Sequence, residues 1–154
     1  MIKQAHNLLD ARHVIGLMQS FLKETSYSQA IAASNDIEHL GKLSFTFMQH
    51  GYVWLAFVKE QPVGMLIATV EPNMWSPKNR QMRELIWYVI PEHRKTSMGG
   101  RLFAEYCKQG EQLLEQGKID GYFTTRMTTT DPIGLERRGF KLKEMTYLKE
   151  RLGE

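Results

Sequence analysis

One stretch of the chain places basic and small residues where an apolar strand gives way to a helix. Residues 89–102 read VIPEHRKTSMGGRL: a strand end, a short basic loop, and a helix start. At such a junction several backbone N–H groups point at one spot, at the positive end of the helix dipole. Glycine lets a ligand approach the backbone, and Arg94, Lys95 and Arg101 add positive charge. This pattern is typical of a loop that binds a pyrophosphate.

A simpler interpretation of the same loop is an ordinary strand-to-helix turn whose lysine and arginine side chains are only solvated. The spacing of the residues does not separate these two interpretations. A Walker A loop is excluded, because no Gly-Lys-Ser or Gly-Lys-Thr sequence ends the turn.

The elements that must position this loop follow from hydrophobic periodicity. Asp10 and Asn35 are the predicted N-caps of two amino-terminal helices, and Gly51 is expected to end the second. Residues 74–79 are expected to form a longer connection between strands. The predicted order is two helices (about 10–22 and 35–50), three strands (52–58, 63–70 and 85–90), a long helix (about 97–117), a strand (119–127), a short helix that begins at Asp131-Pro132 and ends at Gly139, and one or two terminal strands (140–152).

The strand–helix–strand unit over residues 85–127 is expected to be a right-handed crossover between parallel strands. A chain of 154 residues is long enough for one domain with a core and too short for two. We therefore predict a single domain over residues 1–154, with the α/β class and helices on both faces of a mixed sheet.

Composition excludes several classes of protein. Hydrophobic residues at 42% and charged residues at 24% are typical of a compact globular chain. No apolar run approaches the roughly 18 residues of a membrane span, and the first residues lack an apolar signal region. The lone cysteine, Cys107, excludes an internal disulfide framework, and the five histidines show no zinc spacing. We expect a cytoplasmic protein without a membrane partner or a metal.

The net charge of +3 suits an anionic partner. A ligand with several phosphates satisfies this charge as well as RNA or DNA does. Nucleic acid is the less favoured partner, because the basic residues lack the interleaved aromatic side chains on which single strands stack.

The loop resembles the acetyl-CoA motif of the GNAT (GCN5-related N-acetyltransferase) superfamily, R/Q-x-x-G-x-G/A. Arg94 fits the first position and Gly99 the last, while Ser97 replaces the middle glycine. The lead-in Val-x-Pro-Glu-x-Arg is also similar to the family, and residues 135–140 (LERRGF) are similar to its Tyr-Glu-Lys-x-Gly-Phe signature. Gly64 and the Trp-Tyr-Val run at 87–89 resemble short members from phage and prophage genomes.

The resemblance implies a GNAT-like mixed, twisted sheet flanked by helices, an α-β-α sandwich with parallel strands splayed at the cofactor cleft. The pantetheine arm of acetyl-CoA would enter at the splay and pair with residues 87–90. There the N–H of Ile90 or Val89 would polarise the thioester oxygen. The residues implied to bind the cofactor are Val89, Ile90, Arg94, Lys95, Thr96, Ser97, Met98, Gly99, Gly100, Arg101 and Thr128.

The acceptor implied by the resemblance is a primary amine, on a protein lysine, an amino terminus or a small molecule. A lysine-like amine has a pKa of about 10.4 and must lose a proton before it attacks directly in a ternary complex. Glu84 is the implied base. Glu84 and Val89 face opposite sides of a regular strand, and a β-bulge, common in this strand of the family, would bring them to one side. The alternative is Glu84 as a surface partner of Arg80 or Arg83.

The family's usual tyrosine acid is absent, because Leu135 stands at its position. Water could protonate the leaving thiolate. The alternative is a catalytically weak module with this fold that binds CoA or another protein. Tyr27 and Trp75 are the candidate acceptor contacts. Cys107 and Tyr147 are expected to be packed, and a homodimer is compatible with the resemblance.

Overall fold

The computed structural model describes residues 1–24, 36–126 and 134–147 of the chain. Tyr27, Thr128 and the predicted cap at Asp131-Pro132 lie outside these ranges. The elements are, in chain order, β1 (Ile2–Gln4), α1 (Leu8–Glu24), α3 (Ile37–His50), β2 (Gly51–Val58), β3 (Gln61–Asn73), β4 (Ser76–Val89), a 3₁₀ helix (Pro91–His93), α4 (Met98–Glu115), β5 (Gly121–Phe123) and a second 3₁₀ helix (Leu135–Arg138).

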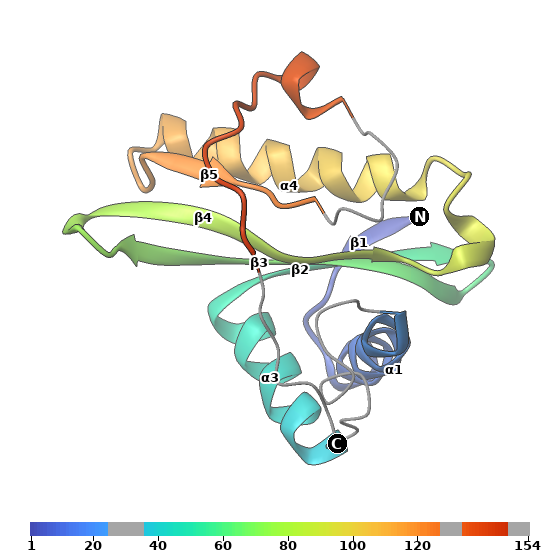
Figure 1. Cartoon of the computed structure of the whole chain (residues 1–154). Coiled ribbons are helices and arrows are strands. Elements are labelled where there is room, and N and C mark those ends of the chain that lie inside the picture. The colour runs from blue at the N-terminus through green and yellow to red at the C-terminus, as the bar shows by residue number, and fades with distance from the viewer. Residues whose placement is uncertain (25–35, 127–133, 148–154) are drawn as a thin grey trace, which may run out of the picture.

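The five strands form one mixed sheet in the order β1-β2-β3-β4-β5. The strand pairs β1–β2, β2–β3 and β3–β4 are antiparallel. Strands β4 and β5 pair in parallel, and α4 connects them in the sequence. Helices α1 and α3 cover one face of the sheet and α4 covers the other (Figure 1). The predicted α-β-α sandwich around a mixed sheet is confirmed.

Each face of the sheet has its own hydrophobic core. Neighbouring residues of β3 alternate between the two: Leu66 packs in the cluster under α4, while Met65 and Ile67 pack in the cluster under α1 and α3. All three side chains are fully buried. Burial of one such side chain stabilises the fold by about 1.5–3 kcal/mol, so the central strands are rigid supports for the loops at their ends.

The predicted connection over residues 74–79 is wrong. Strand β4 begins at Ser76, so only Met74 and Trp75 separate it from β3. The outer halves of these strands face solvent and lack apolar alternation. Cross-strand polar pairs support them instead, such as Arg83 Nε to Glu71 Oε1 at 3.1 Å.

The carboxyl-terminal predictions fail in part. Strand β5 has three residues, fewer than the predicted 119–127, and residues 140–147 form no strand. Phe140 packs against Phe103 and Tyr122, but the apolar side chains after it face solvent: Leu142 is 76% exposed, Met145 69% and Tyr147 85%. The expectation that Tyr147 is packed is therefore wrong. The short helix is confirmed as a 3₁₀ turn that ends at Gly139, where φ is +84°.

The predicted helix caps are displaced. Asn7 caps α1 by accepting the N–H of Asp10 at 2.9 Å, and the Asp10 carboxylate itself is buried beside Lys3 Nζ at 2.5 Å. Asp36 caps α3 by accepting the N–H of His39 at 2.9 Å. Gly51 ends α3 as predicted. Strand β1 was missed, because three edge residues carry no periodic signal. None of the described helices is long and apolar enough to cross a membrane.

Candidate active site

Strands β4 and β5 pair for a short distance and then part. Their parallel register covers only residues 81–83 of β4 against 121–123 of β5. Beyond that point β4 continues beside β3 as far as Val89. On its other edge no described strand pairs with residues 84–89. The predicted splay is therefore present, directly before the loop with the pyrophosphate pattern.

The hydroxyl of Tyr106 lies at the point of divergence. It donates a hydrogen bond to the Phe123 carbonyl of β5, and its oxygen also meets the Glu84 backbone N–H of β4. A direct bond between these two strand groups would need a separation of about 2.9 Å. An intervening hydroxyl excludes that bond and holds the strands apart. Tyr106 of α4 is fully buried, so the core fixes the position of its hydroxyl between the two strands.

A β-bulge sets the direction of Glu84. Ala68 of β3 pairs with Glu84 and the adjacent Ile67 pairs with Ile86, so Leu85 is an extra residue in β4. The bulge reverses the alternation beyond it. The Glu84 carboxylate meets the threonines that follow β5 and lies near Tyr106 of α4, and Val89 packs in the cluster under α4, so both face the same side. The bulge expected from the resemblance is confirmed.

Glu84 is a buried carboxyl, 4% exposed. Three donors converge on its Oε2: the Thr125 N–H at 2.9 Å, the Thr125 hydroxyl at 3.1 Å and the Thr124 hydroxyl at 3.2 Å. Burial raises the pKa of Glu84 above its ordinary value, and these hydrogen bonds oppose the rise only in part. Such a group can exchange a proton closer to neutral pH than a solvated glutamate can.

The alternative role of Glu84, a surface ion pair with Arg80 or Arg83, is wrong. Arg83 pairs with Glu71, and Arg80 donates to the Val70 carbonyl at 3.4 Å. The two threonines that hold Glu84 were not predicted. They lie some forty residues away in sequence and approach Glu84 only because β5 ends beside β4.

The two candidate oxyanion donors differ in the structure. The Ile90 N–H donates to the Val63 carbonyl at 2.9 Å, so it is already used within the sheet. In an antiparallel ladder the next pair, Gly64 with Val89, then points its backbone groups away from each other. The Val89 N–H is therefore directed to the open edge. Of the two predicted oxyanion donors, only the Val89 N–H is therefore free to bind a ligand.

The loop after β4 holds a set of backbone donors at the start of α4. Among residues 95–101, four N–H groups have no hydrogen-bond acceptor in the described part of the chain: those of Lys95, Ser97, Gly99 and Gly100. Each lies in the last turn before α4 or in its first turn, where the helix dipole is positive. These are the groups that an anion would need.

Three other predicted donors are used inside the loop. The Thr96 N–H bonds to the His93 carbonyl, the Met98 N–H to Thr96 Oγ1 at 3.3 Å, and the Arg101 N–H to the Ser97 carbonyl. Ser97, in place of the middle glycine of the motif, has a φ of −74° that any residue adopts. The substitution therefore causes no strain.

The two glycines at the helix start leave space above the backbone. A Cβ on Gly100 would meet no atom within 4 Å, and one on Gly99 would make only ordinary contacts, 3.6 Å from Val89 Cγ2. Neither residue needs glycine for its backbone angles or for packing. The Trp87 indole fixes this turn by donating to the Gly99 carbonyl at 3.2 Å. A ligand can approach the free amides through this space.

The basic side chains of the loop are not equivalent. Arg94 donates from Nε to the Val89 carbonyl at 2.9 Å, and its Nη2 pairs with Glu24 at the end of α1. Lys95 and Arg101 are exposed, and neither forms an ion pair with another described residue. These two side chains therefore stay unpaired in the described part of the chain, whereas the Arg94 guanidinium is engaged within the protein.

Other singled-out residues lie away from the loop. Trp75 is 86% exposed at the tip of the β3–β4 hairpin, and eight residues of extended strand, roughly 26 Å, separate Ser76 from Glu84. Leu135 and Cys107 are partly buried against the core under α4, where packing was expected for Cys107.

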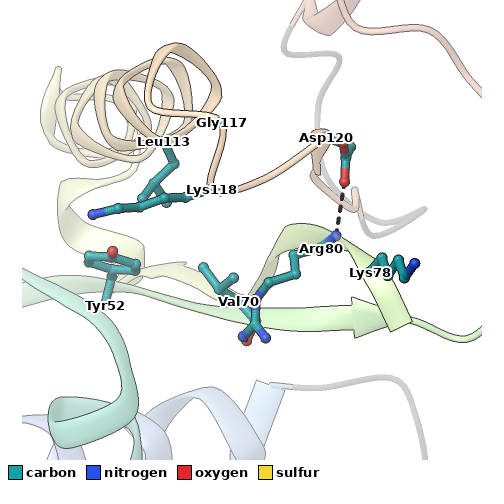
Figure 2. A pocket seen from close by; sticks show the side chains of 8 residues that line it. All are labelled: Tyr52, Val70, Lys78, Arg80, Leu113, Gly117, Lys118 and Asp120. Carbon is teal, nitrogen blue, oxygen red and sulfur yellow. Dashed lines mark hydrogen bonds between the residues drawn. The ribbon is translucent and has the colours of Figure 1, made fainter. Parts of the chain in front are cut away.

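A hollow of about 410 Å³ lies at the far end of α4 from the loop. Figure 2 shows Lys78 and Lys118 pointing to opposite sides of it, while Asp120 is held by the Arg80 N–H at 3.0 Å. The basic side chains do not converge on it. Neither Glu84 nor any residue of the loop before α4 lines this hollow. Its lining residues are Tyr52, Val70, Lys78, Arg80, Leu113, Gly117, Lys118 and Asp120.

Solved structures resemble the whole chain. A GCN5-related N-acetyltransferase from Ralstonia eutropha superimposes with a TM-score of 0.72 at 17% identity, over 97% of both chains. The chain has the GNAT fold. No protein-family model matches the sequence, and no curated protein is significantly similar to it.

Two further structures with the GNAT fold were solved with ligands. A predicted acetyltransferase from Clostridium acetobutylicum, with acetyl-CoA, has a TM-score of 0.70 at 12% identity over 97% of this chain and 96% of that one. An aminoglycoside acetyltransferase from an uncultured soil sample, in complex with sisomicin, has a TM-score of 0.65 at 18% identity over 99% and 96%. At these identities the likeness establishes the fold, and the resemblance to phage members stays a prediction.

Proposed function

We propose that this protein is an N-acetyltransferase that uses acetyl-CoA and acts on a primary amine. One observation carries the proposal: a buried carboxyl lies where β4 parts from β5, and four unpartnered amides lie after the end of the same strand, at the start of α4. The amides suit a pyrophosphate and the carboxyl suits a proton acceptor. An ordinary strand-to-helix turn with solvated side chains would need neither the free amides nor the buried carboxyl.

The residues present fit coenzyme A. The free amides of Lys95, Ser97, Gly99 and Gly100 would hold its pyrophosphate, and the space over the two glycines is the space that a Cβ would fill. Lys95 and Arg101 would add countercharge. The open edge of β4 offers the backbone groups of Trp87 for a pantetheine amide. The GNAT structure with acetyl-CoA supports this choice of donor.

Glu84 would accept the proton that an ammonium group loses before attack, directly or through water. Its raised pKa brings it nearer to the working range of a base, and the two threonines fix its position. Acetyl-CoA supplies the acetyl group as a thioester. The Val89 N–H would stabilise the negative charge on the thioester oxygen, an effect of about 2.7–4 kcal/mol for one such donor.

The nitrogen–carbon bond forms as the carbon–sulfur bond breaks, and the thiolate leaves with the bonding electrons. Leu135 has no proton to give, and it is packed against the core under α4. Water would protonate the thiolate. No covalent enzyme intermediate is needed, and burial raises the pKa of the Cys107 thiol, which disfavours it as a nucleophile.

Leu135 also favours a second candidate, a module that binds CoA without efficient turnover. The two functions separate in one experiment. Purified protein binds acetyl-CoA in calorimetry under both, but only the enzyme releases free thiol when given peptide, polyamine or aminoglycoside amines. The complex of a similar fold with sisomicin is the reason to include aminoglycosides.

Direct transfer has its own test. Mass spectrometry of the enzyme with acetyl-CoA alone should find Cys107 unmodified. An acetylated Cys107 that passes its group to an amine would overturn direct attack. Failure to bind acetyl-CoA at all would overturn the proposed function.

A further inference from the structure

Glu24, the last residue of α1, reaches across to the splayed strand and the loop. Its Oε1 accepts a 2.5 Å hydrogen bond from the Tyr88 hydroxyl, and its Oε2 pairs with Nη2 of Arg94. These partners are 64 and 70 residues away in sequence. One carboxylate therefore ties together α1, β4 and the first position of the cofactor motif.

Three contacts hold the Arg94 side chain, which is otherwise about half exposed. Its Nε donates to the Val89 carbonyl at 2.9 Å, its Nη2 meets Glu24, and its guanidinium lies over the Tyr88 ring at 5.6 Å. An Arg–carboxylate pair with such directional bonds is stronger than a solvated one. The guanidinium could offer its Nε and Nη2 donors to a phosphate only by leaving these partners.

The charges agree with this arrangement. Tyr88 and Arg94 hold the pKa of Glu24 below its ordinary value against the opposing effect of burial, so the carboxylate is charged at neutral pH. Its negative charge offsets the positive charge of Arg94. The groups left for an anion are the four free amides and the side chains of Lys95 and Arg101.

We propose that Glu24 is a positioning residue for the cofactor loop. It holds Arg94 against β4, so that the free amides that follow are presented in one fixed arrangement, and it keeps Arg94 from serving as a phosphate ligand. This inference rests on the proposed function for its consequence in acetyl-CoA binding. The ordering of the loop is a property of the protein alone.

A direct role of Arg94 in phosphate binding would predict the opposite effect of removing Glu24. If Arg94 were a phosphate ligand, removal of Glu24 would free its guanidinium, and acetyl-CoA would bind equally well or more tightly. If Glu24 positions the loop, the same change weakens binding.

The experiment compares Glu24→Ala, Arg94→Ala and the double variant by calorimetry with acetyl-CoA and by amide hydrogen exchange of the protein alone. We expect Glu24→Ala to speed exchange over residues 90–101 and to weaken binding about tenfold, the scale of one charge-assisted hydrogen bond. Arg94→Ala should do the same, and the double variant should be no weaker than either. Glu24→Gln, which keeps one of the two acceptor oxygens, should recover part of the affinity.

Glu38→Ala is the matched control, because it removes an exposed helix carboxylate whose 2.7 Å partner is Lys42. It should alter neither measurement. Unchanged exchange in both Glu24→Ala and Glu24→Gln, or tighter binding in Glu24→Ala, overturns the inference. Wild-type protein that fails to bind acetyl-CoA overturns the proposed function instead, while exchange still decides whether Glu24 orders the loop.

Discussion

The hydroxyl of Tyr106 donates a hydrogen bond to the backbone carbonyl of Phe123, at the point where β4 and β5 separate. Because its oxygen also meets the Glu84 N–H, Tyr106→Phe removes the atom that lies between these two backbone groups. We expect the strands to pair directly. Acetyl-CoA affinity should then fall at least about tenfold, with little loss of thermal stability.

Tyr122→Phe is the control for that change. Tyr122 packs beside Tyr106 at a centroid distance of 5.7 Å, but its hydroxyl bonds to the exposed Glu111 at 2.6 Å. This variant should bind acetyl-CoA normally. If Tyr106→Phe also binds normally, the hydroxyl is not what opens the cleft.

Replacement of Glu84 by glutamine tests the base. Glu84→Gln keeps the size and the acceptor oxygen for Thr125, but it cannot take a proton. We expect the turnover rate to fall by roughly 10²–10⁴-fold, with acetyl-CoA affinity retained. In the wild type the rate should rise with pH through the raised pKa of Glu84 and then level off. Thiol release measured across pH gives both results, and an unimpaired glutamine variant would exclude Glu84 as the base.

The same carboxyl should make stability depend on pH. Its folded pKa is raised above the ordinary value of 4.5, so between these two values the folded protein binds more protons than the unfolded chain. The contribution of Glu84 to the free energy of unfolding is therefore greatest below pH 4.5, falls as pH rises through this window, and stays low above it. Denaturant titrations should show a flatter pH dependence for Glu84→Gln than for the wild type; identical slopes would contradict the raised pKa.

A bulky side chain at the helix start should block the phosphate site. Valine is a better helix former than glycine, and a Cβ at Gly100 meets no atom of the protein. Gly100→Val should therefore fold normally and lose acetyl-CoA binding. Gly99→Val should do the same, with closer contact to Val89.

The matched control is Gly16→Val in α1, another helical glycine with no atom within 4 Å of its added Cβ. It should keep both its melting temperature and its affinity for acetyl-CoA. Normal binding by Gly100→Val would mean that the free amides are not the phosphate site.

Trp75 is the candidate acceptor contact that geometry favours least. It projects from the hairpin tip, roughly 26 Å of strand from the buried carboxyl. We expect Trp75→Ala to change kcat/KM for an amine acceptor less than about twofold, within roughly 0.4 kcal/mol. A large rise in KM would show instead that an extended acceptor reaches this tip, and measurement with short and long peptides would separate the two.

The sequence by itself determined the loop and the order of the main elements. Glycines at the start of α4, the apolar run in β4 and the period of each core helix are local signals, and local backbone geometry follows from them. These signals were enough to predict the sandwich and the parallel crossover. The amides of Lys95, Ser97, Gly99 and Gly100 were among the cofactor contacts that the resemblance implied. The bulge at Leu85 was expected from the resemblance.

Only the tertiary structure decided which groups are free to act. The Ile90 N–H donates to the Val63 carbonyl, and the Arg94 guanidinium pairs with Glu24. The Glu84 carboxylate accepts from Thr125. Each of these contacts joins residues far apart in sequence, and no periodicity records which side chains meet when strands and helices pack. A backbone donor is available only if no other element satisfies it, and that condition is set by the whole fold.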